Sequence, residues 1–298
     1  MSTSRVAEAF EPPRASNPRM PFASPRLICL LAALACALAP TRLPAQASDI
    51  PSAAPPTVAG QTSEQRGRIL LDQMIAALGG TAWLNRASVQ QEGRTAAFFH
   101  GEPNLGVTEF IEYHRLPVNG QTEADRIEFT KKRDIIQIWT PDNGYEITYK
   151  GNSALPADQV ADTLRRRAHS IEAVVRTWIN APGVVIVSEG ASMVERKLAD
   201  KITVLSANND AVTIEIDSAT HLPLRRTFQW RNDQFKDHDE DTEEYDDYHT
   251  IQGLPTAMTL TRYHNGDMAS QRYLTKVTYN VAFDPVLFDH DLPLHKKK

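Results

Sequence analysis

The chain has 298 residues, with 32 Lys and Arg against 37 Asp and Glu, which gives a formal net charge of −5. This acidic balance excludes the broad positive surface on which proteins that bind nucleic acid or anionic membranes rely. The length favours one sizeable domain, and no internal repeat suggests a solenoid. We therefore expect no nucleic-acid partner.

The first 47 residues are typical of an export signal. An apolar run, residues 27–39, is followed by Ala45-Gln46-Ala47, a small-x-small site of the kind that signal peptidase cuts. The run is too short to span a membrane, which takes about 20 apolar residues. We predict export to the periplasm, as a soluble protein in preference to one lipid-anchored at Cys36, whose flanking sequence loosely resembles a lipobox.

Removal of this signal changes the composition of what remains. Both cysteines, Cys29 and Cys36, lie within it, so a chain cut after residue 47 has no disulfide, thiolate metal site or cysteine nucleophile. Cleavage also removes five arginines and two glutamates. The cleaved chain then has 27 basic and 35 acidic residues, a net charge of −8. The first translated residue is left open between Met1 and Met20, because translation from Met20 gives the segment before the apolar run a more usual length.

Residues 48–60 are rich in Pro and Ala and predict an extended, disordered linker. A helix follows, capped by Thr62 or Ser63 and ended by Gly79-Gly80. Trp83-Leu84 predicts a short second turn. The apolar residues of the helix recur at spacings of three and four: Ile69, Leu70, Met74, Ala77 and Leu78.

From Val89 onward, apolar and polar residues alternate with a period of two, which indicates β-strands. The alternation is clear in residues 107–113 and 127–129. Asp142-Asn143-Gly144 predicts a hairpin turn between strands 135–139 and 145–149, because Asn and Gly adopt a positive φ at little cost.

One helix, residues 156–180, interrupts the predicted sheet and ends before Pro182-Gly183. Arg165, Arg166 and Arg167 lie on its polar face. They are either a solvated surface or a lid that binds a phosphate or a lipid headgroup. The opposite stripe consists of Val160, Leu164, Ile171, Val174, Val175 and Trp178.

The second half of the chain returns to strands, and residues 212–217 alternate without a fault. We predict an α+β fold, mainly antiparallel β, in which about ten strands form a half-open, curved barrel covered by two helices. Two helices are few for so large an apolar face, which favours an apolar cavity beneath them. The single domain spans residues 61–292, and a basic tail, residues 293–298, follows. The remaining strands are expected at residues 184–188, 202–206, 222–230, 247–251, 258–263 and 273–279, with hairpin turns at Asn208-Asn209 and Asn265-Gly266.

No catalytic motif is present: the chain lacks a Gly-x-Ser-x-Gly elbow, a His-Glu-x-x-His pair, a Walker loop and a glycine-rich dinucleotide turn. The nine histidines are scattered along the chain. We therefore predict that the protein is not an enzyme and that it uses no cofactor and no metal.

The acidic run 237–244 has aspartates at the first three ligand positions of a calcium-binding EF-hand loop. However, Thr242 stands where that loop needs Gly, and Tyr248 stands where it needs Glu. We interpret the run as a solvated hairpin loop.

Three stretches are more distinctive: residues 216–224, residues 245–256, and residues 279–281 together with 288–289. Their Asp-x-x-Thr-x-Leu-Pro and Tyr-Asp-Asp-Tyr patterns, and the Gly-Leu-Pro that follows, resemble the closing half of the lipoprotein-carrier superfamily, the LolA/LolB-like outer-membrane lipoprotein-sorting proteins. This resemblance implies a half-open β-barrel whose apolar cavity accepts acyl chains in transit through the periplasm.

The resemblance implies a non-catalytic carrier or binder of a lipid or acyl-chain ligand, with sorting of lipoproteins to the outer membrane as one form of it. Envelope membrane proteins are then expected partners, and the oligomeric state is left open. The alternative is a structural or accessory envelope protein that has the same fold and no ligand. The expected cavity lining is Phe129, Ile136, Ile138, Tyr145, Ile147, Val212, Ile214, Ile216, Phe228 and Trp230.

Overall fold

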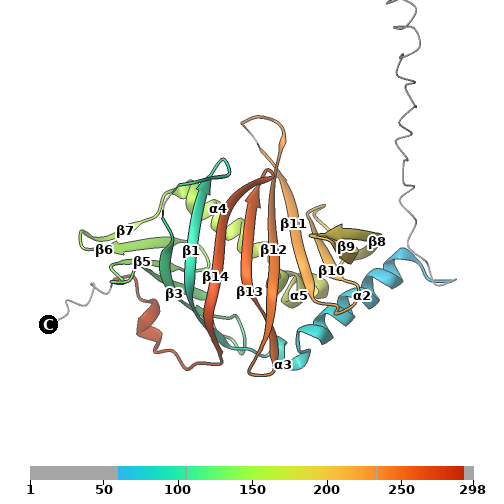
Figure 1. The fold of residues 1–298 in the computed structure, drawn as a ribbon, viewed down its shortest axis with the longest axis horizontal. Coiled ribbons are helices and arrows are strands. Elements are labelled where there is room, and N and C mark those ends of the chain that lie inside the picture. Colours follow the sequence, from blue (N-terminus) through green and yellow to red (C-terminus); the bar gives the residue numbers. More distant parts are fainter. Residues whose placement is uncertain (1–59, 105, 233, 292–298) are drawn as a thin grey trace, which may run out of the picture. The chain divides into compact units, whose positions relative to one another are not determined.

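The computed structural model describes residues 60–291, except 105 and 233. The predicted signal, the linker apart from Gly60, and the basic tail lie outside the described residues. The described part of the chain forms one antiparallel sheet of 14 strands, accompanied by four α-helices and two short 3-10 helices (Figure 1).

The sheet is open, with β7 and β8 at its edges and the order β7-β6-β5-β4-β3-β1-β14-β13-β12-β11-β10-β9-β8, while β2 pairs with β1 alone. The strand count exceeds the predicted ten because short strands such as β2 and β7 expose every residue and show no alternation. The strands are β1 Ser88–Phe99, β2 Glu102–Pro103, β3 Thr108–Arg115, β4 Ala124–Phe129, β5 Ile135–Trp139, β6 Gly144–Thr148, β7 Gly151–Ala154, β8 Val185–Val194, β9 Lys197–Leu205, β10 Ala211–Asp217, β11 Pro223–Arg231, β12 His238–Ile251, β13 Leu254–His264 and β14 Asp267–Tyr279.

Helix α2, Ser63–Leu78, begins and ends where the sequence predicts. The Thr62 hydroxyl accepts from the backbone N–H of Gln65, whose side chain accepts from the N–H of Thr62 in return, and Gly79 ends the helix at a φ of 121°. A short helix, α3 (Thr81–Leu84), follows as expected. α2 packs closely on β8: a Cβ added to Gly67 would lie 2.8 Å from the carbonyl oxygen of Ile186.

The predicted helix 156–180 is wrong as a single element, because it breaks after Ala168. It forms α4 (Ala157–Ala168), α5 (Ile171–Arg176) and the 3-10 helix η2 (Trp178–Asn180). The hydroxyl of Ser170 accepts from the N–H of Ala173 and so caps a new helix. His169, which is buried, lies at the break. The chain therefore has a bend between the two helical segments.

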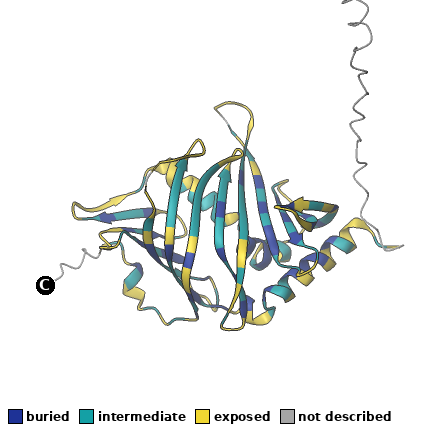
Figure 2. Cartoon of the chain, in the orientation of Figure 1, coloured by how far each residue is buried: buried dark blue, intermediate teal, exposed yellow. Residues whose placement is uncertain are grey.

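Helices α4 and α5 lie behind the sheet in Figure 1, against the face that we call the inner face. This face carries Val212, Ile214 and Ile216, which are fully buried in the main core. Figure 2 shows buried segments alternating with intermediate and exposed ones along the strands. α2 and α5 contribute most of the helical side of that core. Its helical members are Leu70, Leu71, Met74, Leu78, Trp83, Ile171, Val174 and Val175.

The predicted hairpin turns are present, but one forms for a different reason. Asn209, Asn265 and Gly266 adopt a positive φ, as expected. Residues 140–143 join β5 to β6, but Asn143 and Gly144 do not have a positive φ. Gly144 is required for space, since an added Cβ would lie 2.6 Å from the ring of Trp139.

The acidic run is not the predicted loop: from His238 onward it is the first part of β12. Asp241 is only 2% exposed and lies on the inner face, where it pairs with the equally buried Arg226 of β11. Because charged residues lie on both faces of this strand, its sequence lacks the alternation of apolar and polar residues by which a strand is predicted.

The outer face of β3 to β7 is covered by the chain's own C-terminal segment, residues 280–291, which contains the 3-10 helix η3 (Pro285–Phe288). The ring of Phe283 packs edge-on against Tyr113, and Arg126 donates to the carbonyl oxygen of Leu287. Further along, Asn152 donates to the carbonyl oxygen of His290 at 2.6 Å. This segment buries apolar residues on the face opposite the helices.

Candidate functional site

A cavity of about 240 Å³ lies between α4 and the inner face of the sheet, and we call it the α4 cavity. α4 supplies polar and charged groups, while the strands supply aromatic, aliphatic and further charged groups. The lining residues are Phe98, Phe99, His100, Asp162, Arg165, Arg166, Phe228, Trp230, Asp241, Arg262, His264, Asp267, Met268 and Ala269.

Aromatic rings form one wall of the α4 cavity. Trp230 lies 5.4 Å from Phe228 between ring centroids, and the guanidinium of Arg165 lies 4.6 Å above the ring of Trp230. Arg165 also donates to Asp162 one turn earlier in α4 at 2.6 Å. The positive charge of Arg165 is therefore held by its own helix and by an aromatic face.

A buried ion cluster lies beside this wall, and the sequence analysis missed it. Arg226 donates to Asp241 at 3.3 Å and to Glu243 at 3.4 Å, and the Nε of Arg262 lies 3.8 Å from Asp241. Tyr245 donates to Glu243 at 2.7 Å. Arg226 precedes the inward-facing Phe228 by two residues, so the two side chains lie on the same face of the strand. This spacing predicts that Arg226 points inward.

Arg167 ties α4 to the sheet. Its guanidinium donates to the carboxylate of Asp125 in β4 and, at 2.9 Å, to the carbonyl oxygen of Thr140. On the sheet side, His114 lies 3.3 Å from Glu123 and 3.5 Å from Asp125. We call Arg167, Asp125, Glu123 and His114 the latch.

The charges within the latch depend on burial and on one another. Burial lowers the pKa of His114, but the charge of Asp125 and the hydrogen bond with Glu123 outweigh it and raise the pKa to about 9. For Glu123, burial raises the pKa, but the hydrogen bond from His114 and the charge of Arg167 bring it below its usual value. A positively charged His114 therefore supports the carboxylates that hold Arg167.

The structure places the ten predicted lining residues in three regions. Phe228 and Trp230 line the α4 cavity. Phe228 is also a member of the main core, together with Val212, Ile214 and Ile216, and both Trp230 and Phe129 pack against that core. The remaining four lie on the outer face. Ile136 pairs with Glu128, out of phase with the inward-facing Phe129, and it shares a separate cluster with Ile138 and Ile147, next to Tyr145, whose ring contacts His290. Their role in ligand binding stays a prediction.

The three predicted lid arginines also differ from one another. Arg165 and Arg166 line the α4 cavity, whereas Arg167 belongs to the latch. Arg165 pairs with Asp162 of its own helix, while Glu172 pairs with Arg86 and Arg176. The three arginines are therefore not one solvated face.

A larger groove of about 1160 Å³ is lined by outward-facing residues of β10 to β12 and, from the inner side, by Arg165, Phe228 and Trp230, which it shares with the α4 cavity. Much of its floor is polar and internally bonded. Arg225 donates to Glu215 and Glu244, and Thr227 lies 3.0 Å from Thr242 between hydroxyl oxygens. Such a floor suits water better than an apolar ligand.

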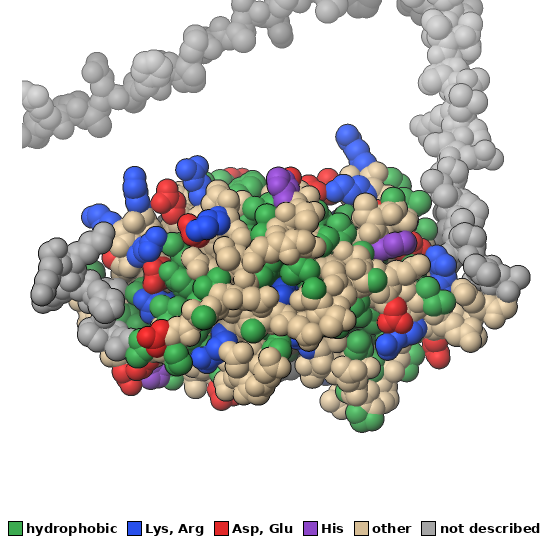
Figure 3. All heavy atoms as spheres, turned by 90° about the horizontal axis from the view of Figure 1, so that it is seen from below, with side chains coloured by type: hydrophobic (Ala, Val, Ile, Leu, Met, Phe, Trp, Pro, Cys, Tyr) green, Lys and Arg blue, Asp and Glu red, His purple; other side chains and the backbone are tan. Residues whose placement is uncertain are grey.

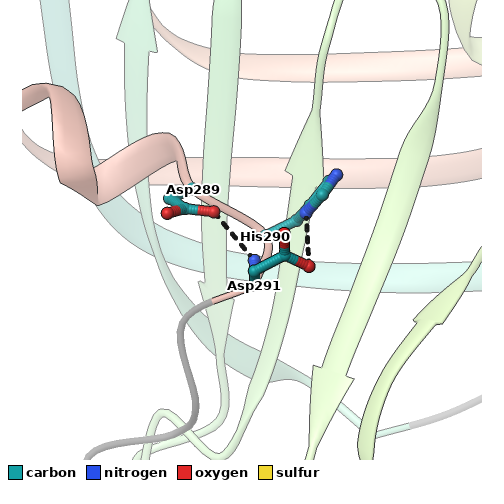
Figure 4. Close-up of side chains that lie close together, drawn as sticks. All are labelled: Asp289, His290 and Asp291. Carbon is teal, nitrogen blue, oxygen red and sulfur yellow. Dashed lines mark hydrogen bonds and ion pairs between the residues drawn. The ribbon is translucent and has the colours of Figure 1, made fainter.

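One group of metal-ligating side chains occurs among the described residues, and it lies in the C-terminal segment (Figure 4). It consists of Asp289, His290 and Asp291. Asp289 accepts from the backbone N–H of Asp291, whose carboxylate lies 3.2 Å from the imidazole of His290. Both carboxylates are exposed and already have these local partners, so the group has the features of a turn.

Among the described helices, none has both the length and the apolar character that a membrane crossing requires. Figure 3 shows the side of the domain that lies lowest in Figure 1, where hydrophobic side chains lie in small groups between polar and charged ones. An exposed Phe99, by contrast, lies at the mouth of the α4 cavity.

No family model and no curated protein matches the sequence. Solved structures do have similar folds. A DUF1329 family protein from Desulfovibrio piger is 12% identical, with a TM-score of 0.53 over 77% of this chain and 98% of that one.

Two further structures are more distant. A domain named for outer membrane lipoprotein sorting, from Vibrio parahaemolyticus, has a TM-score of 0.49 at 10% identity and covers 76% of this chain and 97% of that one. A LolA superfamily protein from Nitrosomonas europaea has a TM-score of 0.46 at 10% identity, over 76% and 99% of the two chains.

The first likeness shows a shared fold, and the other two are too distant to add to it. The expected α+β fold, mainly antiparallel β, is thus confirmed, and at 12% identity the likeness extends to nothing beyond the fold.

Proposed function

We propose that this chain is an exported, non-catalytic carrier or binder of a lipid-like ligand, which it holds between α4 and the inner face of the sheet. One observation carries the proposal: α4 covers a cavity lined by aromatic rings and arginines, yet none of its own residues is fully buried. A helix packed for stability alone would bury its apolar stripe.

The physical need for such a shield is large. Each CH₂ group that leaves an apolar environment for water costs about 0.8 kcal/mol, so a long acyl chain costs roughly 10 kcal/mol. Apolar surface for the first part of an acyl chain is supplied by four residues of the cavity lining, Phe98, Phe228, Trp230 and Met268. Val160 and Leu164 of α4, which are half-buried, supply more once the helix moves.

The size of the α4 cavity requires that movement. Its 240 Å³ is smaller than the roughly 300–1,000 Å³ of sites that enclose drug-sized ligands. A whole acyl chain therefore enters only when α4 moves away from the sheet. In this movement the bend at His169 is the hinge, and the contacts of the latch hold α4 in the closed position. His169 is suited to the hinge because its ring stacks on Phe228 and its Nε2 lies 2.8 Å from Asp210, which fixes the bend in place.

We further propose that the working protein is soluble in the periplasm and exchanges its ligand with envelope membrane proteins, sorting of lipoproteins to the outer membrane being one such task. The export signal in residues 1–47 supports this location. Intact mass of the mature protein is the test: cleavage after Ala47 supports a soluble protein, and an acylated Cys36 contradicts it.

Mass spectrometry of organic extracts from the purified protein tests the binding function. Co-purified acyl species are expected. The competing function is a structural or accessory protein with a packed interior, which the complete burial of Val212, Ile214 and Ile216 favours. That function predicts an empty extract and no binding of added amphiphiles, and this pair of results would overturn the proposal.

A further inference from the structure

The inner face beside the α4 cavity holds more positive than negative charge. Arg226 and Arg262 lie next to two carboxylates, Asp241 and Glu243. A third guanidinium, that of Arg166, lines the same cavity as Arg262 and Asp241. Both carboxylates are engaged by Arg226, which is 2% exposed. One positive charge is therefore left without a matching carboxylate.

Arg166 is the least compensated of the three. Its guanidinium donates to the hydroxyl of Thr163 in its own helix at 2.9 Å. Within the described part of the chain, no carboxylate lies within ion-pair distance of it. Burial and the neighbouring charge of Arg262 lower the pKa of Arg166 to about 10. Arg166 stays charged at neutral pH, in surroundings that disfavour the charge.

Arg262 also has bonding capacity to spare. Its Nε is buried without a hydrogen-bond partner, and it lies 3.8 Å from Asp241, which is too long for a hydrogen bond. Unpaired donors of this kind are costly in a fold, and they concentrate where a ligand completes them. Both Arg166 and Arg262 line the α4 cavity.

Other charged residues of the cavity lining form ion pairs with neighbouring residues. Arg165 pairs with Asp162 on α4, and His100 lies 3.7 Å from Asp267 at the mouth. The uncompensated charge is thus confined to the space between Arg166 and Arg262, and the apolar wall of Phe98, Phe228, Trp230 and Met268 adjoins it.

We propose that the α4 cavity contains an anion subsite, in which the phosphate or carboxylate head of an amphiphile lies between Arg166 and Arg262. Guanidinium groups are suited to this task because their N–H groups match the geometry of phosphate and carboxylate oxygens. The first methylenes of the tail lie on the aromatic wall, and the rest follows beneath α4. This inference rests on the proposed function and adds the chemical class of the ligand.

Binding of matched probes to the purified chain, measured by titration calorimetry below their micelle concentrations, tests the inference. Dodecyl phosphate carries the anionic head, dodecyl maltoside carries the same tail on a neutral head, and inorganic phosphate carries the anion alone. We expect dodecyl phosphate to bind about tenfold more tightly than dodecyl maltoside, which corresponds to about 1.4 kcal/mol. Inorganic phosphate is expected to bind far more weakly than either.

The variants Arg166→Gln and Arg262→Gln should each remove most of this preference by weakening the binding of dodecyl phosphate far more than that of dodecyl maltoside. Arg68→Gln is the matched control, because Arg68 lies exposed on α2 and pairs only with Asp72 among the described residues. If both dodecyl probes bind the wild-type chain equally, the anion subsite is wrong while the carrier function stands. If neither binds, the carrier function itself fails.

Two further results separate the remaining possibilities. Inorganic phosphate that binds as tightly as dodecyl phosphate would mean a free-anion site and would overturn the headgroup assignment. Thermal unfolding of Arg166→Gln provides a second readout: a melting temperature equal to or above that of the wild type supports a residue held for a ligand. A clear fall would show that Arg166 serves the fold and would count against the subsite.

Discussion

Helices α4 and α5 follow one another directly in the chain, yet they are held in different ways. The six residues of α5 bury Ile171, Val174 and Val175 in the main core. The twelve residues of α4 bury none, and α4 is fixed to the sheet chiefly by the polar contacts of Arg167. Packing holds one helix and hydrogen bonds hold the other, and polar contacts can be exchanged with a ligand or water at lower cost.

The largest effect is expected on the packed side. Ile171→Ala in α5 should reduce the free energy of unfolding by about 3 kcal/mol, because it removes a buried side chain and leaves a cavity. Urea denaturation followed by circular dichroism measures the loss. A loss below about 1 kcal/mol would show that α5 is no better packed than α4.

The pH dependence of stability tests the sheet side of the latch. The pKa of His114 is raised to about 9 in the folded chain from an ordinary 6.5, so its contribution is fully present below pH 6.5 and is lost as the pH rises through 9. The contribution is at most about 3 kcal/mol. Unfolding free energies of the wild type should therefore fall between about pH 6 and about pH 9.5, and those of His114→Gln should fall much less. An equal decline in both proteins would refute the role of His114.

The helix side of the latch is tested by Arg167→Ala. Loss of its bonds to Asp125 and Thr140 should destabilise the chain by about 2 kcal/mol and speed the uptake of dodecyl phosphate. Stopped-flow tryptophan fluorescence follows uptake, since Trp230, one of the four tryptophans, lines the cavity. Arg68→Ala, which breaks an exposed pair on α2, should change stability by less than about 0.5 kcal/mol and leave uptake unchanged. Slower uptake in Arg167→Ala would contradict the latch.

The smallest effect is expected from Leu164→Ala in α4. This side chain is half-buried, so its removal should cost about 1 kcal/mol, well below the cost of Ile171→Ala in the neighbouring helix. The same denaturation experiment compares the two variants directly. Equal losses would mean that both helices are packed alike and would remove the basis for a movable α4.

Much of the fold could be predicted from local patterns. The alternation of residues 212–217 predicts β10, and the turn that follows is stabilised by Asp217, whose carboxylate accepts from the N–H groups of Ala219 and Thr220. The break at His169 was missed because all its neighbours favour a helix and only the cap at Ser170 signals a new start. Local sequence patterns therefore predict the helices and strands more reliably than the positions at which one helix ends and the next begins.

The site was harder to predict, because a period of two separates two faces without revealing what covers each. Ile136, Ile138 and Ile147 alternate as a cavity wall would, but the C-terminal segment lies over their side of the sheet. Asp241 was assigned to a solvated loop because its partner, Arg226, lies on the neighbouring strand. Pairing across strands and cover from distant segments are properties of the folded chain, and the sequence pattern does not contain them.

Site-specific hydrogen exchange of α4 and α5, with and without dodecyl phosphate, tests the central claim most directly. In the free chain we expect the amides of α4 to exchange at least roughly tenfold faster than those of α5, because local opening of α4 breaks few contacts. The probe should slow exchange in α4 and leave α5 unchanged. Equal exchange in both helices, or an α4 that does not respond to a probe that binds, would contradict a movable helix over a lipid site.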